Sequence, residues 1–384
     1  MAFSNKSAVL IATGALLVAL AACNGNSAVP SSQSGAQTGA RQTVAESNAA
    51  QPAVDTTSIL KKLTKDVVIG TTIDPTNGDM GPRGLSVIQL DYHFKKGQLL
   101  VCNFDDKTGA PGKGTTIDLF NPQPSSSPQT VVQSSDIEGC DGTTPTSNND
   151  VYATGLTSHL LTGFMSNGKV VKSYGKPFVA PLSLVDAANP KMYSAEYIFG
   201  SDARTGGIIS FSINMYGNNK PTEVGSGFDV NQKPDWGKLG PSGLQYEKKS
   251  NVLYIADGVD NVIDEFTNVS ELLVPKEIVV QDKGLKFACK YPHTTCGKVL
   301  FSGAPLNAPV ALALLPNGNL IAANTAGGNT LVEISSAGKV LDTKVVDTSS
   351  TAGIFGIAAS GTSDSNTVLF YTDTNTNTLH ELEQ

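Results

Sequence analysis

The stretch APVALALLPNGNLIAAN at residues 308–324 decides the fold. It holds two apolar runs, 308–315 and 319–324, joined by the turn Asn317-Gly318. An Asn-Gly pair between two such runs is a strong signal for a β-hairpin. Two further strand-like runs, 330–334 and 339–343, follow after glycine-containing turns. Four short antiparallel strands in one repeat are typical of a β-propeller blade.

Blocks of about 45 residues with the same layout recur along the chain, as expected of a repeat architecture. Four further blocks are visible, at residues 81–120, 180–211, 240–266 and 356–382. A degenerate block at 150–171 lacks a convincing first strand. We therefore expect six blades, five clear and one degenerate.

The block at 240–266 resembles the NHL repeat. It contains Gly240-Pro241-Ser242-Gly243-Leu244, then an apolar run ending in Ala256-Asp257, then a third run that begins at Asn261. The resemblance covers about residues 57–384 and implies a β-propeller.

The last block ends after its third strand, at Gln384. A propeller must pair its last blade with its first blade or leave an exposed edge. Residues 64–71 are a strand-like run that can supply the missing outer strand. The sequence thus predicts an all-β propeller over residues 58–384, with six four-stranded blades closed by an N-terminal strand.

The N-terminus has the features of an export signal. Lys6 precedes an apolar run at 8–20, which has the length of a signal-peptide core. The following Leu20-Ala21-Ala22-Cys23 resembles the lipobox of bacterial lipoproteins. This resemblance implies a signal peptide at 1–22 and acyl chains on Cys23 that hold the protein to membrane lipid. The alternative is an ordinary cleaved signal with a chance cysteine.

Residues 23–57 are expected to form a flexible tether, because this segment is rich in Ser, Ala, Gln and Gly and has no aromatic residue. In the rule for Gram-negative lipoproteins, Asp after the cysteine retains the protein at the inner membrane. Asn24 stands there instead, which implies the outer membrane.

Four more cysteines are expected to form two disulfides in an exported protein. Cys289 and Cys296 close a short loop, and Cys102 with Cys140 then pair by elimination. A metal site using His293 is the alternative. It lacks both a Cys-x-x-Cys spacing and a second clustered histidine.

The composition excludes some partners and favours many turns. The net charge is −7, only 16% of residues are charged, and no basic block is present, so nucleic-acid binding is not expected. The chain has 38 Gly and 20 Pro, which suits short strands and turns. No cofactor motif is found.

Functional sites of propellers usually lie at the mouth of the central channel, where the inner strands begin. The residues expected there are Arg83, Ser183, Ser242, Ala311 and Ile357. Lactonase-like six-bladed propellers, which this architecture resembles, hold a divalent cation with Glu, Asn and Asp. No acidic residue is expected in this ring, so no metal site and no catalytic residue are predicted.

Three residues are weak candidates for ligand binding. Arg83 can meet an anionic ligand or pair with a loop carboxylate. Trp236 and Tyr246, with the insertions at 107–114, 134–150 and 283–305, can form an exposed binding face or simply pack the loops.

Polar residues recur after the second strand of several blades. These are expected to close the turns there through backbone hydrogen bonds; they are Asn103, Thr154, Asp257, Asn324 and Asp373.

The leading functional hypothesis is a membrane-tethered, non-catalytic module that binds a protein, peptide or glycan. The alternative is a metal-dependent, lactonase-like hydrolase or lyase. A third possibility is a structural part of an envelope assembly. The sequence indicates no oligomeric state.

Overall fold

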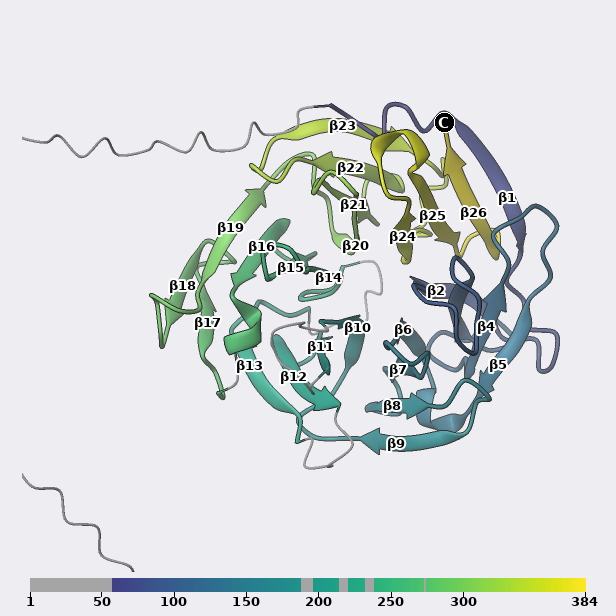
Figure 1. Cartoon of the computed structure of the whole chain (residues 1–384), viewed down its shortest axis with the longest axis horizontal. Coiled ribbons are helices and arrows are strands. Elements are labelled where there is room, and N and C mark those ends of the chain that lie inside the picture. Colours follow the sequence, from purple (N-terminus) through teal and green to yellow (C-terminus); the bar gives the residue numbers. More distant parts are fainter. Residues whose placement is uncertain (1–56, 188–195, 214–219, 232–237, 273) are drawn as a thin grey trace, which may run out of the picture. The chain divides into compact units, whose positions relative to one another are not determined.

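The computed structural model describes residues 57–187, 196–213, 220–231, 238–272 and 274–384. These residues form six β-sheets arranged as blades around a central axis (Figure 1). The prediction of an all-β, six-bladed propeller is therefore confirmed. Within the described ranges, no helix is long and apolar enough to span a bilayer.

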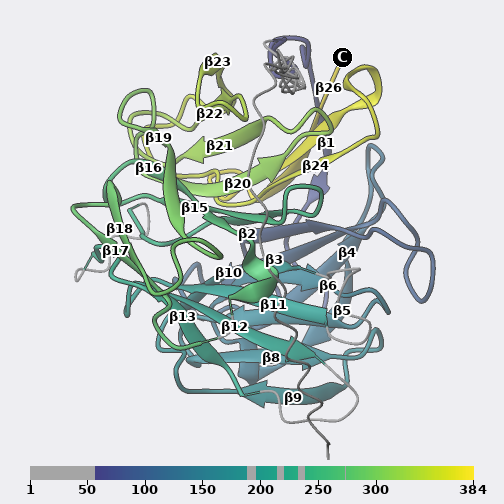
Figure 2. The same ribbon diagram turned by 60° about the vertical axis from the view of Figure 1, so that its left-hand side comes forward.

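Each blade has its first strand at the axis, and later strands follow outward. Blade 1 consists of β2 (Met80–Val87), β3 (Leu99–Asp105), β4 (Thr116–Phe120) and β5 (Gln129–Gln133), and blade 2 of β6 (Cys140–Pro145), β7 (Val151–Gly155), β8 (Leu160–Phe164) and β9 (Val170–Tyr174). Blade 3 contains β10 (Pro181–Asp186), β11 (Glu196–Asp202), β12 (Gly207–Ile213) and β13 (Thr222–Ser226), and blade 4 contains β14 (Leu244–Glu247), β15 (Val252–Asp257), β16 (Val262–Thr267) and β19 (Gly297–Ser302). Blade 5 is β20 (Pro309–Leu314), β21 (Leu320–Asn324), β22 (Thr330–Ile334) and β23 (Val340–Val345), and blade 6 is β24 (Ile357–Ser360), β25 (Val368–Asp373), β26 (Thr378–Glu383) and β1 (Lys65–Thr71). Figure 2 shows the same blades from another side.

Blade 2 is complete, which corrects the expectation that its first strand is missing. Its inner strand β6 lies within residues 134–150, which the sequence suggested to be a loop insertion. The strand reads CDGTTP and has no large apolar side chain to mark it. Gly142 is needed there, because a Cβ at this position would lie 2.1 Å from the carbonyl oxygen of Leu182 in the next blade.

Residues 283–305 are also not a simple loop. A hairpin of β17 (Ile278–Gln281) and β18 (Lys286–Cys289) leaves blade 4 and extends the sheet of blade 3, where β17 pairs in parallel with β13. The predicted disulfide between Cys289 and Cys296 is present and ties the end of this hairpin to the residue before β19. The insertion therefore fastens two neighbouring blades together.

The N-terminal strand closes the ring as predicted. β1 pairs antiparallel with β26, from Lys65 opposite Glu383 to Thr71 opposite Thr378. Before this strand, Ile59, Leu60 and Leu63 are fully buried among residues of blades 5 and 6.

Glu333, a fully buried residue of β22, holds the start of this segment. Its carboxylate accepts hydrogen bonds from the Leu60 amide at 2.8 Å, the Ile59 amide at 3.2 Å and the Ser58 hydroxyl at 2.7 Å. The closing segment is thus fixed by both a backbone ladder and a buried carboxylate.

Two buried carboxylates of blade 4, Asp257 and Asp264, have raised pKa values. Asp264 on β16 is fully buried, and neither of its carboxylate oxygens has a hydrogen-bond partner in the described part of the chain. Burial, together with the nearby charges of Asp257 and Asp260, raises the pKa of Asp264 to about 8. The pKa of Asp257 is raised to about 7, mainly by burial.

Deletion of residues 57–75 should destabilise the whole ring. Each fully buried Ile or Leu contributes about 1.5–3 kcal/mol, so the three lost side chains alone approach the total stability of a typical domain, about 5–15 kcal/mol. Thermal unfolding followed by circular dichroism should show a lower and broader transition, and Glu333→Ala should show a smaller decrease. An unchanged cooperative transition in the truncated chain would rule out this role, and Lys61→Ala, at an exposed position, serves as the control.

Asp264 should make the domain less stable as the pH rises. Its pKa in the folded chain, about 8, exceeds the ordinary value of 3.8, so folding takes up a proton between these values. The stabilising contribution is complete below pH ~4 and is lost as the pH approaches ~8. Denaturant unfolding should show a decline of about 1 kcal/mol per pH unit for one such group. Asp264→Asn should reduce this slope and be more stable than the wild type at pH 8.

The exposed carboxylate of Asp282 provides the control for this measurement. Asp282→Asn should keep the pH dependence of the wild type. If the curves for Asp264→Asn and the wild type ran parallel, the buried carboxylate would not be the source of the effect.

Candidate functional site

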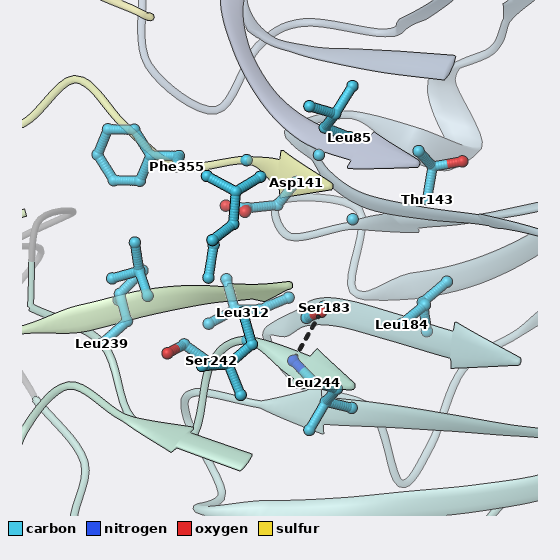
Figure 3. Close-up of a pocket in the computed structure, with 18 of the residues that line it drawn as sticks. Leu85, Asp141, Thr143, Ser183, Leu184, Leu239, Ser242, Leu244, Leu312 and Phe355 are labelled. Carbon is cyan, nitrogen blue, oxygen red and sulfur yellow. Dashed lines mark hydrogen bonds between the residues drawn. The ribbon is translucent and has the colours of Figure 1, made fainter. Parts of the chain in front are cut away.

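A channel runs along the propeller axis between the six inner strands. We call the end where the inner strands begin the upper mouth and the end where they finish the lower mouth. An upper chamber has about 560 Å³ of atom-free space, open solvent included. Residues of all six inner strands, or residues just before these strands, line it. Figure 3 shows Leu239 and Phe355 at one end of this chamber, with Thr143 and Leu184 toward the other.

A lower chamber of about 820 Å³, also counted with open solvent, continues the channel. The two chambers share Leu85, Thr143, Leu184 and Gln245 as lining residues. The two chambers therefore adjoin along the axis.

Hydroxyl groups on the second strands hold the inner strands around this channel. In blade 2, the Gly142 amide donates to Thr154 Oγ1 at 2.8 Å, and the Thr154 hydroxyl donates to the carbonyl of Leu182 in blade 3 at 2.6 Å. Ser201 forms the same bridge from Ser183 to Ser242, and Thr372 forms it from Gly356 to Arg83. Each hydroxyl thus joins its own inner strand to that of the next blade.

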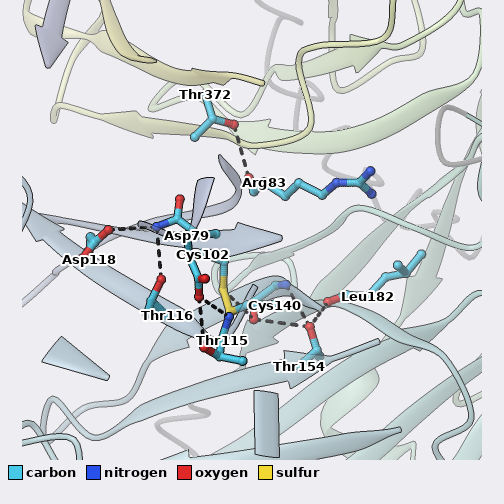
Figure 4. The surroundings of a disulfide bond; sticks show 12 residues. Asp79, Arg83, Cys102, Thr115, Thr116, Asp118, Cys140, Thr154, Leu182 and Thr372 are labelled. Carbon is cyan, nitrogen blue, oxygen red and sulfur yellow. Dashed lines mark hydrogen bonds between the residues drawn. A yellow bond between two sulfur atoms is a disulfide. The ribbon is translucent and has the colours of Figure 1, made fainter. Parts of the chain in front are cut away.

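The junction of blades 1 and 2 carries a covalent link at the corresponding place. The predicted disulfide joins Cys102 of β3 to Cys140 of β6 (Figure 4). Both cysteines are fully buried. Figure 4 also shows the bridges from Thr154 to Leu182 and from Thr372 to the backbone of Arg83.

Arg83 is buried near the upper mouth, with 5% of its side chain exposed. Its Nη1 lies 3.2 Å from Oδ2 of Asp141 on β6. Its guanidinium carbon lies 3.7 Å from the ring centroid of Phe104 and 4.0 Å from that of Phe355. The structure thus pairs Arg83 with a carboxylate, but the partner lies on an inner strand and not on a loop.

We expected no acidic residue among those that begin the inner strands, and this expectation is wrong. Asp141 occupies this ring, and it was missed because β6 was missed. Burial raises the pKa of Asp141 while Arg83 lowers it. The pair brings one positive and one negative charge to the upper mouth.

A second carboxylate lies near this pair. Asp105, the last residue of β3, is influenced by the charges of Arg83 and Asp141. Burial raises its pKa to about 6, although Arg83 acts in the opposite direction. A carboxyl group with this pKa can exchange a proton near neutral pH.

The upper mouth does not fit a divalent cation of the lactonase type. Such an ion needs several oxygen ligands, and here the guanidinium of Arg83 already occupies Asp141 and would repel a cation. Across the described ranges, no three His, Cys, Asp or Glu side chains are arranged to hold a metal ion.

The remaining candidates do not form one binding face. Tyr246 lines the lower chamber, so it lies at the opposite end of the channel from Arg83. The loop at 107–114 joins β3 to β4 and therefore lies at the upper end. Trp236 and Cys23 lie outside the described residues.

The predicted role of the turn residues is confirmed in part. Asp257 Oδ1 accepts hydrogen bonds from the amides of Val259 and Asp260, and Asp373 Oδ1 accepts one from Asn375. Asn324 Oδ1 accepts one from the amide of Asn307, in the loop that leads to its own blade.

Two of these positions act differently. Thr154 bridges two blades, and Asn103 donates to Asp118 at 2.9 Å. The repeat pattern in the sequence did not single out Asp202, which ends the second strand of blade 3. Its carboxylate accepts hydrogen bonds from the amides of Val179, Ala180 and Thr205. The sequence contains the same pattern there, because Asp202, like Asp257, directly precedes a turn after a second strand.

Removing one partner of the Arg83–Asp141 pair should be more harmful than removing both. Arg83→Met keeps much of the bulk between the two rings but leaves a buried carboxylate without its cation, which typically costs about 3–5 kcal/mol. The double variant Arg83→Met/Asp141→Leu should recover most of this loss. Free energies of unfolding from urea titrations test this. Additive losses in the double variant would contradict the coupling.

Comparisons with known proteins support the fold. No model of a protein family matches the sequence, and no curated protein matches it. A gluconolactonase from Xanthomonas campestris is similar over 82% of this chain and 88% of its own, with 12% identity and a TM-score of 0.52. A luciferin-regenerating enzyme is similar over 83% and 96%, with 12% identity and a TM-score of 0.50. A virginiamycin B lyase from Staphylococcus aureus is similar over 83% of this chain and 98% of its own, with 15% identity and a TM-score of 0.49. At these identities the likeness is one of fold alone: the chain is a six-bladed β-propeller.

Proposed function

We propose that this chain is an exported, lipid-anchored, NHL-like β-propeller that acts as a non-catalytic binding module for a protein, peptide or glycan. The observation that supports it best is the axial channel with its two adjoining chambers. The Arg83–Asp141 pair lies buried near its upper mouth, and its walls consist largely of backbone, hydroxyl and aliphatic groups. Such walls suit recognition of a chain end or a small group.

The proposed anchor rests on the sequence around Cys23. An export signal, a lipobox and a polar segment follow one another in the order expected of a lipoprotein. The two disulfides suit an oxidising compartment outside the cytoplasm. The outer membrane is the proposed location, because Asn24 follows the cysteine.

A hydrolase or lyase of the six-bladed propeller type is the second candidate. The fold likeness to the gluconolactonase favours it, as does the half-buried Asp105, whose pKa of about 6 suits proton transfer. Asp105, Arg83 and Asp141 would then form the reactive group at the upper mouth. The metal-dependent version has the least support, because the donor set does not fit a cation.

Two assays on the purified full chain should separate these functions. Gluconolactone and aryl esters, each with calcium, magnesium or zinc, should show no turnover above background. A thermal-shift screen of peptides and oligosaccharides should find ligands that raise the melting temperature. Turnover that is lost in Asp105→Asn but kept in Asp106→Asn, a partly exposed neighbour, would establish the enzyme instead. In cells, labelled palmitate should mark the wild type and not Cys23→Ser.

A further inference from the structure

The lower chamber has a chemical character of its own. It is formed by the last residues of the inner strands, from β2 to β24, and its polar side chains are oxygen-bearing. They are Ser86, Gln89, Thr143, Thr144, Asp186, Gln245 and Tyr246. Asp186 is the one charged side chain among the described residues that line it, so the charge of this described lining is negative.

Asp186 acts on the chamber electrostatically. It is the last residue of β10. Burial is the larger cause of the raised pKa of Tyr246 on β14, and the charge of Asp186 is the second cause. The carboxylate and the phenol therefore lie near each other on adjacent blades. The Tyr246 hydroxyl donates to Asn251 Oδ1 at 3.2 Å, which fixes the position of the ring.

Several lining groups offer hydrogen-bond acceptors. Thr143 is only 5% exposed, and its hydroxyl has no partner in the described part of the chain. The Ser86 hydroxyl is likewise buried without a described partner. Gln245 uses its amide Nε2 to donate to the Leu312 carbonyl at 2.9 Å, so its amide oxygen is the group left for a ligand.

We infer that the lower chamber binds a protonated primary amine. An ammonium group carries three donors and no acceptor, which complements a carboxylate, an amide oxygen and hydroxyls that lack a partner in the described ranges. An aromatic ring beside the carboxylate adds attraction for a cation. This inference rests on the proposed binding function and names the chemistry of the ligand.

The amine can belong to a lysine side chain or to an amino sugar. Both share the ammonium group, and the proposed partner classes, peptide and glycan, contain one source each. An anionic ligand is disfavoured here, because it would approach Asp186 in a chamber whose described lining residues include no cation.

Calorimetric titration of the purified full chain tests the inference. The probes are a trilysine peptide and glucosamine, with N-acetylated trilysine, N-acetylglucosamine and gluconate as matched ligands without the amine. At least one amine should bind more tightly than its acetylated form by tenfold or more. Which of the two does so identifies the source.

Variants locate the site. Asp186→Asn should weaken amine binding at least tenfold, and Thr143→Val should weaken it severalfold. Asp91→Asn, at an exposed loop position after β2, should leave it unchanged. Melting temperatures of all variants check that they fold.

The outcomes distinguish this inference from the broader function. Equal binding of amines and acetylated ligands, or amine binding that Asp186→Asn leaves intact, would overturn the inference while the binding function stands. Failure of every peptide and glycan to bind would overturn both.

Discussion

Closure of the ring is the constraint on which the rest of the structure depends. Each blade packs between two neighbours, so the first and last blades of the ring must be held together. This is achieved when one blade contains strands from both ends of the chain. Here β1 completes blade 6 by pairing with β26, and the residues before it are buried against blades 5 and 6. Glu333 anchors that segment through two backbone amides. The backbone ladder covers the edge of β26, which would otherwise be exposed.

The closed ring brings the inner strands so near to one another that small residues are required at the axis. A Cβ at Gly356 would lie 1.9 Å from the carbonyl oxygen of Arg83, and hydroxyl bridges such as that of Thr372 join neighbouring inner strands. Backbone and short side chains therefore form most of the channel wall. Few functional groups line the channel. Asp141 and Asp186 do, and Arg83 is buried against Asp141, so these residues strongly influence what the channel can bind.

The sequence predicted the features that leave a periodic or geometric mark. Turn residues and apolar runs predicted the blades, and the unpaired third strand predicted the role of β1. The short loop from Cys289 to Cys296 predicted one disulfide, and elimination predicted the other. It failed where close packing replaces hydrophobic pattern. β6 contains Asp141 and Gly142 in place of large apolar residues, so the strand and its carboxylate were both overlooked. Tyr246 and Arg83 were both singled out, but only the strand directions show that they lie at opposite mouths.

These opposite mouths give the channel a polarity. At the upper mouth the positive charge of Arg83 lies between two aromatic rings and against Asp141, so a ligand meets a nearly neutral, apolar entrance. In the lower chamber Asp186 supplies a carboxylate, and the Thr143 hydroxyl is buried without a partner among the described residues. A ligand with an apolar body and an ammonium end would satisfy both chambers in one orientation only. Because the shared wall at Leu85 and Leu184 is aliphatic, it would hold the body of such a ligand without fixing its identity. Orientation along the axis would then be set by charge, and selectivity by the polar groups of the lower chamber.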